Sequence, residues 1–148
     1  MRSARLFAVL LIIPSLVCAQ ALADDEDKPF AEARIVLQMA EGDAESQTRV
    51  LNVANNLIKH YGGPDFVDIE VVAYGPGLSL LYPGNANEER ISSLLANDVR
   101  FVGCMNTVES IERETGKRPD LIPEAIAVQT GVAHLVEQAQ QGFVVIRP

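Results

Sequence analysis

The residues whose chemistry stands out lie in segment 100–107, Arg-Phe-Val-Gly-Cys-Met-Asn-Thr. An apolar run passes into small and polar residues, and 108–115 then has helical composition. This pattern predicts a buried strand, a tight turn and a helix, with Cys104 where the strand ends. Asn106 is predicted as the N-cap of that helix, and Glu109 three residues later completes a capping-box-like pair.

The expected position of Cys104 favours thiolate chemistry. The unpaired N–H groups and the dipole of a helix N-terminus lower the pKa of a nearby thiol. Gly103 has no side chain beside the sulfur, which is expected to leave room for a partner. The alternative is structural, because free cysteine is among the most often buried residues and Cys104 would then be a small core hydrophobe.

Strands and helices alternate along the rest of the chain. Further apolar runs predict strands at 33–38, 67–73, 124–128 and 143–146. Apolar residues at helical spacing predict helices at 46–61, 88–96 and 130–141. The strands are apolar runs rather than clean alternators, so we expect an α/β sandwich whose largely parallel sheet is covered on both faces.

Ligands of such sheets bind outside the carboxyl ends of the strands. The loops at that edge are expected at 39–43, 74–78, 104–107 and 129–131, so Cys104 would lie beside the glycine-rich turn after the second strand. Neither histidine is expected to belong to this site. His60 suits the last turn of its helix, and His134 is expected on the surface of the last helix.

The N-terminal segment 1–23 has the pattern of a cleavable export signal. Arg2 and Arg5 form a basic region, an apolar stretch follows, and Ala21-Leu22-Ala23 offers a small-x-small cleavage site. Residues 24–32 are then an acidic, flexible lead-in and 33–148 one domain. Without the two signal arginines, ten basic and 20 acidic residues leave a net charge of −10. Such a chain lacks the positive charge that nucleic acid or anionic lipid would attract.

Three segments together resemble the DsrE/DsrF-like proteins, and their small exported branch most of all. They are 72–78 (Val-Ala-Tyr-Gly-Pro-Gly-Leu), 101–107 (Phe-Val-Gly-Cys-Met-Asn-Thr), and Gly131-Val132 with the ending 142–148 (Gly-Phe-Val-Val-Ile-Arg-Pro). The resemblance covers nearly the whole mature chain. It implies a three-layer α/β/α sandwich with a mostly parallel five-stranded sheet, assembled as trimers or hexamers.

The resemblance also implies a function. Well-understood members of the family carry sulfur as a persulfide on a cysteine after the third strand, and Cys104 matches that position. The implied protein is a periplasmic sulfur carrier that takes sulfane sulfur from a donor and passes it to an acceptor. It departs from the cytoplasmic relay proteins in being exported, and no second cysteine follows Cys104 to receive the sulfur.

The predicted site contains Cys104 as the reacting group. Asn106, Thr107, Gly75 and Gly77 are expected to cradle the sulfur, and Tyr74 to donate its hydroxyl. The competing hypothesis is a non-catalytic oligomeric or small-ligand-binding module with Cys104 in the core, since a fold alone does not determine function.

Other classes of function find little in the sequence. The segment Cys104-Met105-Asn106-Thr107 lacks the second cysteine of a dithiol oxidoreductase. Removal of the signal also removes Cys18, and the remaining cysteine and two scattered histidines have no metal-ligand spacing. We recognise no nucleotide-binding glycine motif and no hydrolase triad, so no cofactor is expected and any enzymatic activity would be that of a sulfurtransferase-like carrier.

The signal pattern gives a first prediction. N-terminal sequencing of periplasmic material should read Asp24 first, or Leu22 if cleavage follows Ala21 instead. Exported protein that retains Met1 would contradict the predicted cleavage.

Overall fold

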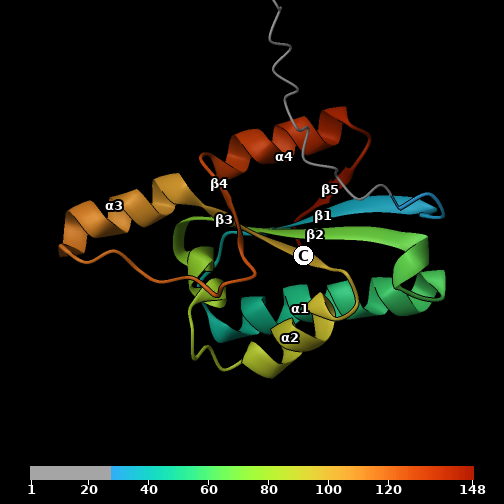
Figure 1. Cartoon of the computed structure of the whole chain (residues 1–148), viewed down its shortest axis with the longest axis horizontal. Coiled ribbons are helices and arrows are strands. Elements are labelled where there is room, and N and C mark those ends of the chain that lie inside the picture. Colours follow the sequence, from blue (N-terminus) through green and yellow to red (C-terminus); the bar gives the residue numbers. More distant parts are fainter. Residues whose placement is uncertain (1–27) are drawn as a thin grey trace, which may run out of the picture.

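The computed structural model describes residues 28–148; the predicted signal peptide, 1–23, lies outside them. Its centre is a five-stranded sheet in the order β4-β3-β2-β1-β5, with every pairing parallel (Figure 1). The strands are β1 (Ala33–Met39), β2 (Val67–Ala73), β3 (Arg100–Cys104), β4 (Ile126–Val128) and β5 (Val144–Ile146). The predicted α/β sandwich with a five-stranded parallel sheet is therefore confirmed.

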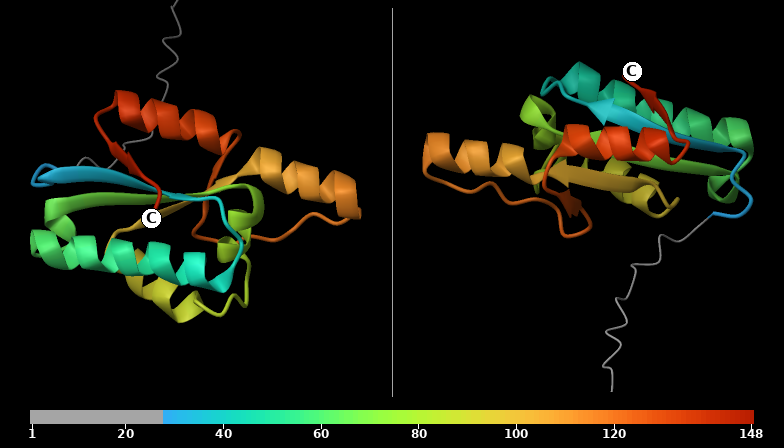
Figure 2. Two further views of the ribbon diagram at one scale, coloured as in Figure 1. Left: turned by 180° about the vertical axis from the view of Figure 1, so that it is seen from behind. Right: turned by 90° about the horizontal axis from the view of Figure 1, so that it is seen from above.

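Helices lie on both faces of the sheet. Helices α1 (Ala44–Tyr61) and α2 (Glu88–Leu95) cover one face, and α4 (Gly131–Gln140) crosses the other (Figures 1 and 2). Helix α3 (Met105–Thr115) instead extends outward from the sheet and buries only Val108. Two 3-10 segments, η1 (Pro64–Phe66) and η2 (Gly75–Leu81), flank β2. No helix within residues 28–148 is long and apolar enough to cross a membrane.

The two faces of the sheet are packed unequally. On the side of α1 and α2, strand residues such as Leu37 and Phe101 join a large apolar cluster with residues of both helices. The cluster under α4 has five buried apolar members: Val36, Val72, Val102, Leu135 and Phe143. Burial of apolar area is the main stabilising term of a fold, so most of the packing energy lies on the α1 side.

Local signals explain the bounds of α1. The Asp43 carboxylate accepts the N–H of Ser46 at 2.9 Å and is the N-cap. Gly62 ends the helix with a φ of 87°, a left-handed conformation that glycine adopts without strain.

The described part of the expected lead-in, residues 28–32, is tied to the domain. Lys28 Nζ donates to the carbonyl of Pro64 at 3.0 Å, and the Glu32 N–H donates to the carbonyl of Phe66 at 2.8 Å. These bonds connect the chain before β1 to η1.

The predicted cap of α3 is wrong. The helix begins at Met105 and its N-cap is Cys104, so Asn106 lies inside the first turn. Strand β3 runs into the helix without the turn residues that the sequence suggested, because its last residue is also the capping residue. This brings the sulfur two residues, about half a turn, closer to the helix N-terminus than an Asn106 cap would place it.

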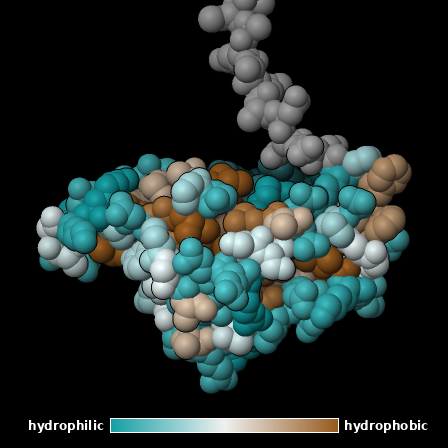
Figure 3. Space-filling view, turned by 60° about the horizontal axis from the view of Figure 1, so that its bottom comes forward, coloured by the Kyte–Doolittle hydropathy of each residue, from teal (hydrophilic) through white to brown (hydrophobic). Residues whose placement is uncertain are grey.

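The surface in Figure 3 is largely hydrophilic, with apolar patches between polar side chains. Exposed large apolar residues occur on α4, where Val132 and Val136 are 52% and 54% exposed, and on the edge strands at Ile126 and Val144.

Gly77 provides a test of the packing at the ends of the strands. A Cβ added there would lie 2.2 Å from the Met39 carbonyl oxygen, a backbone atom with little freedom to move. Gly77→Ala should therefore lower the free energy of unfolding by about 3 kcal/mol. The control Gly84→Ala has open space but a φ of 78°, so it should lose only about 1 kcal/mol. Equal losses in urea denaturation would contradict the packing argument.

Candidate functional site

The order of the strands makes the carboxyl ends of β3 and β4 a topological switch point. The connections after β1, β2 and β3 each lead to the next strand along the sheet, whereas the connection after β4 returns across it to β5. Helix α3 packs Met105, Val108 and Ile111 with the cluster on the α1 side, whereas α4 lies on the opposite face. Adjacent strands whose loops leave toward opposite faces form the usual ligand site of open α/β sheets.

Cys104 lies at this point, with its sulfur between two helix N-termini. The first is that of α3, which Cys104 itself caps. The hydroxyl and N–H of Thr107 and the N–H of Asn106 lower the pKa of the thiol, although the sulfur makes no capping hydrogen bond within α3. The N–H of Asn106 donates to the carbonyl of Gln129 at 3.0 Å. Orphan N–H groups at a helix start are natural donors to a negative charge.

The second N-terminus is that of α4. The N–H of Gly131, the first residue of α4, donates to Cys104 Sγ at 3.2 Å. A Cβ at Gly131 would lie 3.1 Å from Cys104 Cβ and 3.4 Å from Tyr74 Cβ. Glycine is therefore the residue that lets α4 approach the sulfur this closely.

Burial of Cys104 and the donors around it have opposite effects on the pKa of the thiol. Cys104 is only 5% exposed, and burial raises the pKa of its thiol. The donors from Gly131, Thr107 and Asn106 outweigh burial, so the pKa lies below that of an ordinary cysteine. In the neutral form the thiol faces the carbonyl of Gln129, 3.8 Å from Sγ. The site thus favours a thiolate that is largely shielded from water.

Polar bonds join the three loops around the sulfur. The N–H of Gly75 donates to Thr107 Oγ1 at 2.9 Å, which connects the turn after β2 to α3. Asn106 Nδ2 donates to Thr130 Oγ1 at 2.9 Å, and Gln129 Nε2 donates to Asn106 Oδ1 at 2.7 Å. Asn106 therefore links the starts of α3 and α4 instead of capping a helix with its side chain.

Of the predicted site residues, the structure brings Cys104, Thr107, Asn106 and Gly75 together. Tyr74 is a neighbour through its Cβ, but its hydroxyl bonds the side-chain amide of Gln38 on β1. Tyr74 thus has another partner for the group that was expected to reach the sulfur.

The two remaining glycines pack against the core. Gly77 packs against the backbone of Met39 and Ala40. Gly103 points to the other face of the sheet from Cys104, and the space beside it is filled by Leu121, with Leu81 and Leu78 close by. The room expected at Gly103 for an approaching partner is therefore absent.

A depression of about 480 Å³ is lined in part by Thr107, whereas Cys104 is not among its lining residues. Its lining residues come from the start of η2 and from α3: Gly75, Pro76, Asn106, Thr107, Ser110, Ile111 and Glu114. Because Thr107 touches both the depression and the sulfur, a molecule bound there would approach Cys104 along this side chain.

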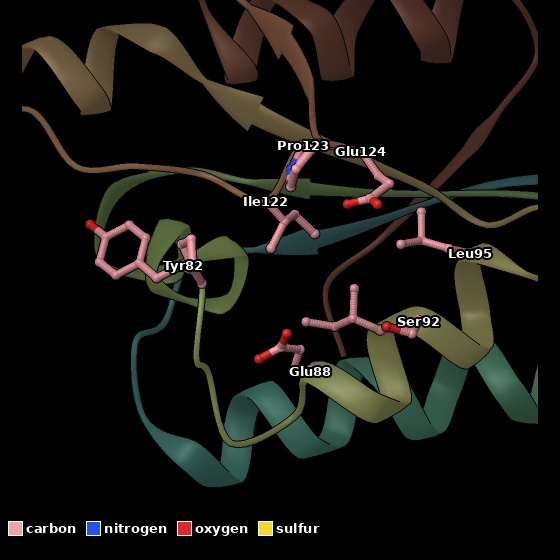
Figure 4. A pocket seen from close by; sticks show the side chains of 9 residues that line it. Tyr82, Glu88, Ser92, Leu95, Ile122, Pro123 and Glu124 are labelled. Atoms are coloured by element: carbon pink, nitrogen blue, oxygen red, sulfur yellow. The ribbon is translucent and has the colours of Figure 1, made fainter.

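A second cavity, of about 200 Å³, is built from different residues (Figure 4). Glu88 of α2 and Glu124 before β4 flank it, with Tyr82, Ile122 and Leu95 on its walls. Burial raises the pKa of the Tyr82 hydroxyl. The cavity shares no lining residue with the surroundings of Cys104 and is not part of the same site.

Within residues 28–148, the fold and the site define an α/β protein with one buried thiol, of lowered pKa, at its topological switch point. No protein-family model and no curated protein matches the sequence. Among solved structures, the chain is similar to MTH1491, a protein of unknown function from Methanobacterium thermoautotrophicum. The identity is 29% and the TM-score 0.70, over 79% of this chain and 100% of that one. The similarity extends across the domain and names no activity.

Sequence reasoning missed Gly131 and His134. The sequence places Gly131 in a predicted loop and in one of the three resembling segments, but a glycine at the first position of a helix also indicates a close approach that a side chain would block. His134, expected on the surface, is half-buried against Glu70 of β2. The sequence feature that could have indicated a polar partner on the sheet is the unusual pair of carboxylates, Asp68 and Glu70, within an otherwise apolar strand.

Thr107 is the side chain through which the thiol can be tested. Thr107→Val keeps the shape but removes the hydroxyl donor, so the thiol pKa should rise and the pH midpoint of alkylation should move upward. Thr107→Ser keeps both the donor and the acceptor for Gly75, and should remain near the wild-type midpoint. The measurement is the rate of iodoacetamide reaction from pH 5 to 9 in a Cys18→Ser background. Identical profiles for the two variants would show that the hydroxyl does not stabilise the thiolate.

Proposed function

We propose that this chain is an exported sulfur-trafficking protein, which carries sulfane sulfur as a persulfide on Cys104 and hands it to a partner. The observation that carries the proposal is the convergence of two helix N-termini on one sulfur: Gly131 of α4 donates its N–H to Sγ, and Cys104 occupies the N-cap position of α3. Attack on sulfane sulfur needs a thiolate, and a lowered pKa supplies it near neutral pH.

The proposed chemistry involves two balanced exchanges. The Cys104 thiolate attacks a terminal sulfur of a polysulfide, so that a new S–S bond forms while the old one breaks and a shortened polysulfide leaves as the anion. A thiolate of the acceptor then attacks the outer sulfur of the Cys104 persulfide and releases the Cys104 thiolate. Each step is a thiol–disulfide type exchange and needs no external oxidant.

The surroundings of the sulfur suit a terminal persulfide anion. Its outer sulfur carries negative charge, which N–H and hydroxyl donors stabilise as they do a thiolate. The depression beside Thr107 offers a place for the donor or acceptor. The resemblance to the DsrE/DsrF-like proteins points in the same direction, and with it the proposal includes a periplasmic location and assembly as a trimer or hexamer.

A second function is favoured by one observation, the 5% exposure of Cys104. On that reading the protein is an oligomeric or small-ligand-binding module and the cysteine is a packing residue. The two functions differ in whether the native thiol reacts. If alkylation of Cys104 occurs only after denaturation, the binding module is the better description.

The test is the mass of the intact protein after incubation with polysulfide. In a Cys18→Ser background we expect additions in steps of one sulfur atom, which a reducing agent removes and peptide analysis locates at Cys104. The control Cys104→Ser is nearly isosteric and should keep its fold while gaining no mass. Native wild-type protein that reacts with iodoacetamide but never gains sulfur would refute the sulfur-carrying role.

A further inference from the structure

Two carboxylates lie on the face of the sheet that α4 covers. Asp68 and Glu70 of β2 are 6% and 2% exposed, whereas their neighbours on the other face of the strand are apolar. A carboxylate buried without partners is strongly unfavourable. The proposed sulfur chemistry uses neither group, so their place in the central region of the sheet requires another explanation.

Both carboxylates are paired, from two different elements. Arg100 of β3 donates to Asp68 Oδ1 at 2.6 Å and to Glu70 Oε2 at 3.3 Å. From α4, His134 Nε2 contacts the second oxygen, Glu70 Oε1, and Gln138 Nε2 lies 3.5 Å from the same ring nitrogen. We call these five residues the sheet–helix cluster. Glu70 is its centre, because it alone contacts both the arginine of the sheet and the histidine of the helix.

One more charged residue faces the cluster from β1. Arg34 is the register partner of Asp68 and lies over the ring of Phe143, 5.9 Å from its centroid. The charged groups on this face are thus contributed by β1, β2, β3 and α4.

Apart from the cluster, few side chains fix α4 on the sheet. Its buried residues are Gly131, Leu135 and Gln138, of which Leu135 alone is a large apolar side chain. Apolar contacts are non-directional, whereas the contact between His134 and Glu70 specifies where the helix lies along β2. His134 follows Gly131 by three residues, or about 4.5 Å along the axis. A displacement at His134 therefore reaches the N–H that bonds the sulfur.

We propose that Glu70 and His134 position α4 so that the Gly131 N–H keeps its hydrogen bond to Cys104 Sγ, and that they thereby set the acidity of the thiol. Both are positioning residues, since neither touches the sulfur. In its functional meaning the inference rests on the proposed sulfur-carrying role, for which an acidic thiol is needed. The acidity itself is measurable without any sulfur transfer.

The decisive variant is Glu70→Gln, because loss of a through-space charge and displacement of α4 would shift the pH midpoint of alkylation in opposite directions. Removal of a negative charge acting through space stabilises a thiolate and lowers the alkylation midpoint. Release of α4 instead weakens the hydrogen bond from Gly131 to the sulfur, which destabilises the thiolate and raises the alkylation midpoint. We expect an upward shift of about one pH unit, which slows alkylation at pH 6 about tenfold. Glu137→Gln removes an exposed carboxylate from the same helix and should leave the midpoint unchanged.

A double-variant cycle tests whether Glu70 acts on the alkylation midpoint through the Gly131 hydrogen bond. Gly131→Ala should raise the midpoint by itself, because its Cβ forces α4 away from Cys104. If Glu70 acts through the same hydrogen bond, the double variant Glu70→Gln, Gly131→Ala should shift no further than the larger single shift. Additive shifts, or a midpoint in Glu70→Gln that is unchanged or lower, would overturn the proposal.

The cycle remains informative if Glu70→Gln does not fold, which circular dichroism reveals. His134→Gln leaves Glu70 paired with Arg100, and its combination with Gly131→Ala gives the same choice between additive and non-additive shifts. Failure of the sulfur-carrying role would show instead as wild-type protein with a normal low-pH alkylation profile that takes up no sulfur from polysulfide. The two failures are therefore separate results.

Discussion

The hydrogen bond from the Gly131 N–H to Cys104 Sγ connects the last part of the chain to the rest of the site. It requires β4 to lie beside β3, so that the loop before α4 passes over the end of the cysteine strand. It also requires a residue without a side chain at the start of α4. Strand order and one glycine together place a second helix N-terminus at the thiol of a residue that is already the N-cap of the first.

This arrangement makes α4 both a structural element and part of the site. The face it covers has a small apolar cluster, and polar residues hold much of the remaining interface. Within the described residues no buried side-chain nitrogen or oxygen lacks a hydrogen-bond partner. A polar interface of this kind gives less burial energy than an apolar one but defines one position of the helix, as directional contacts do.

The sequence predicted the parts of the structure that local patterns determine. Apolar runs located the five strands, and Cys104 was placed correctly at the carboxyl edge. The errors arise where a distant contact decides. Asn106 has the composition of a cap, but its side chain bonds Thr130 and Gln129. His134 has a surface spacing on its helix, and only the pairing of β2 with the face under α4 reveals Glu70 as its partner. Such contacts join residues more than 20 positions apart, which no local pattern shows.

Burial and acidity of the thiol have a common structural origin. The loops that donate to the sulfur are also the loops that cover it, so a more exposed Cys104 would lose donors and become less acidic. Thr107 lies on the boundary, since it lowers the pKa of the thiol, accepts a hydrogen bond from Gly75 and also lines the outer depression. A persulfide extends the reactive atom beyond the buried sulfur, and the outer atom needs room that the thiolate does not. Movement of Thr107 and the turn at Gly75 would provide that room while Gly131 continues to hold the inner sulfur.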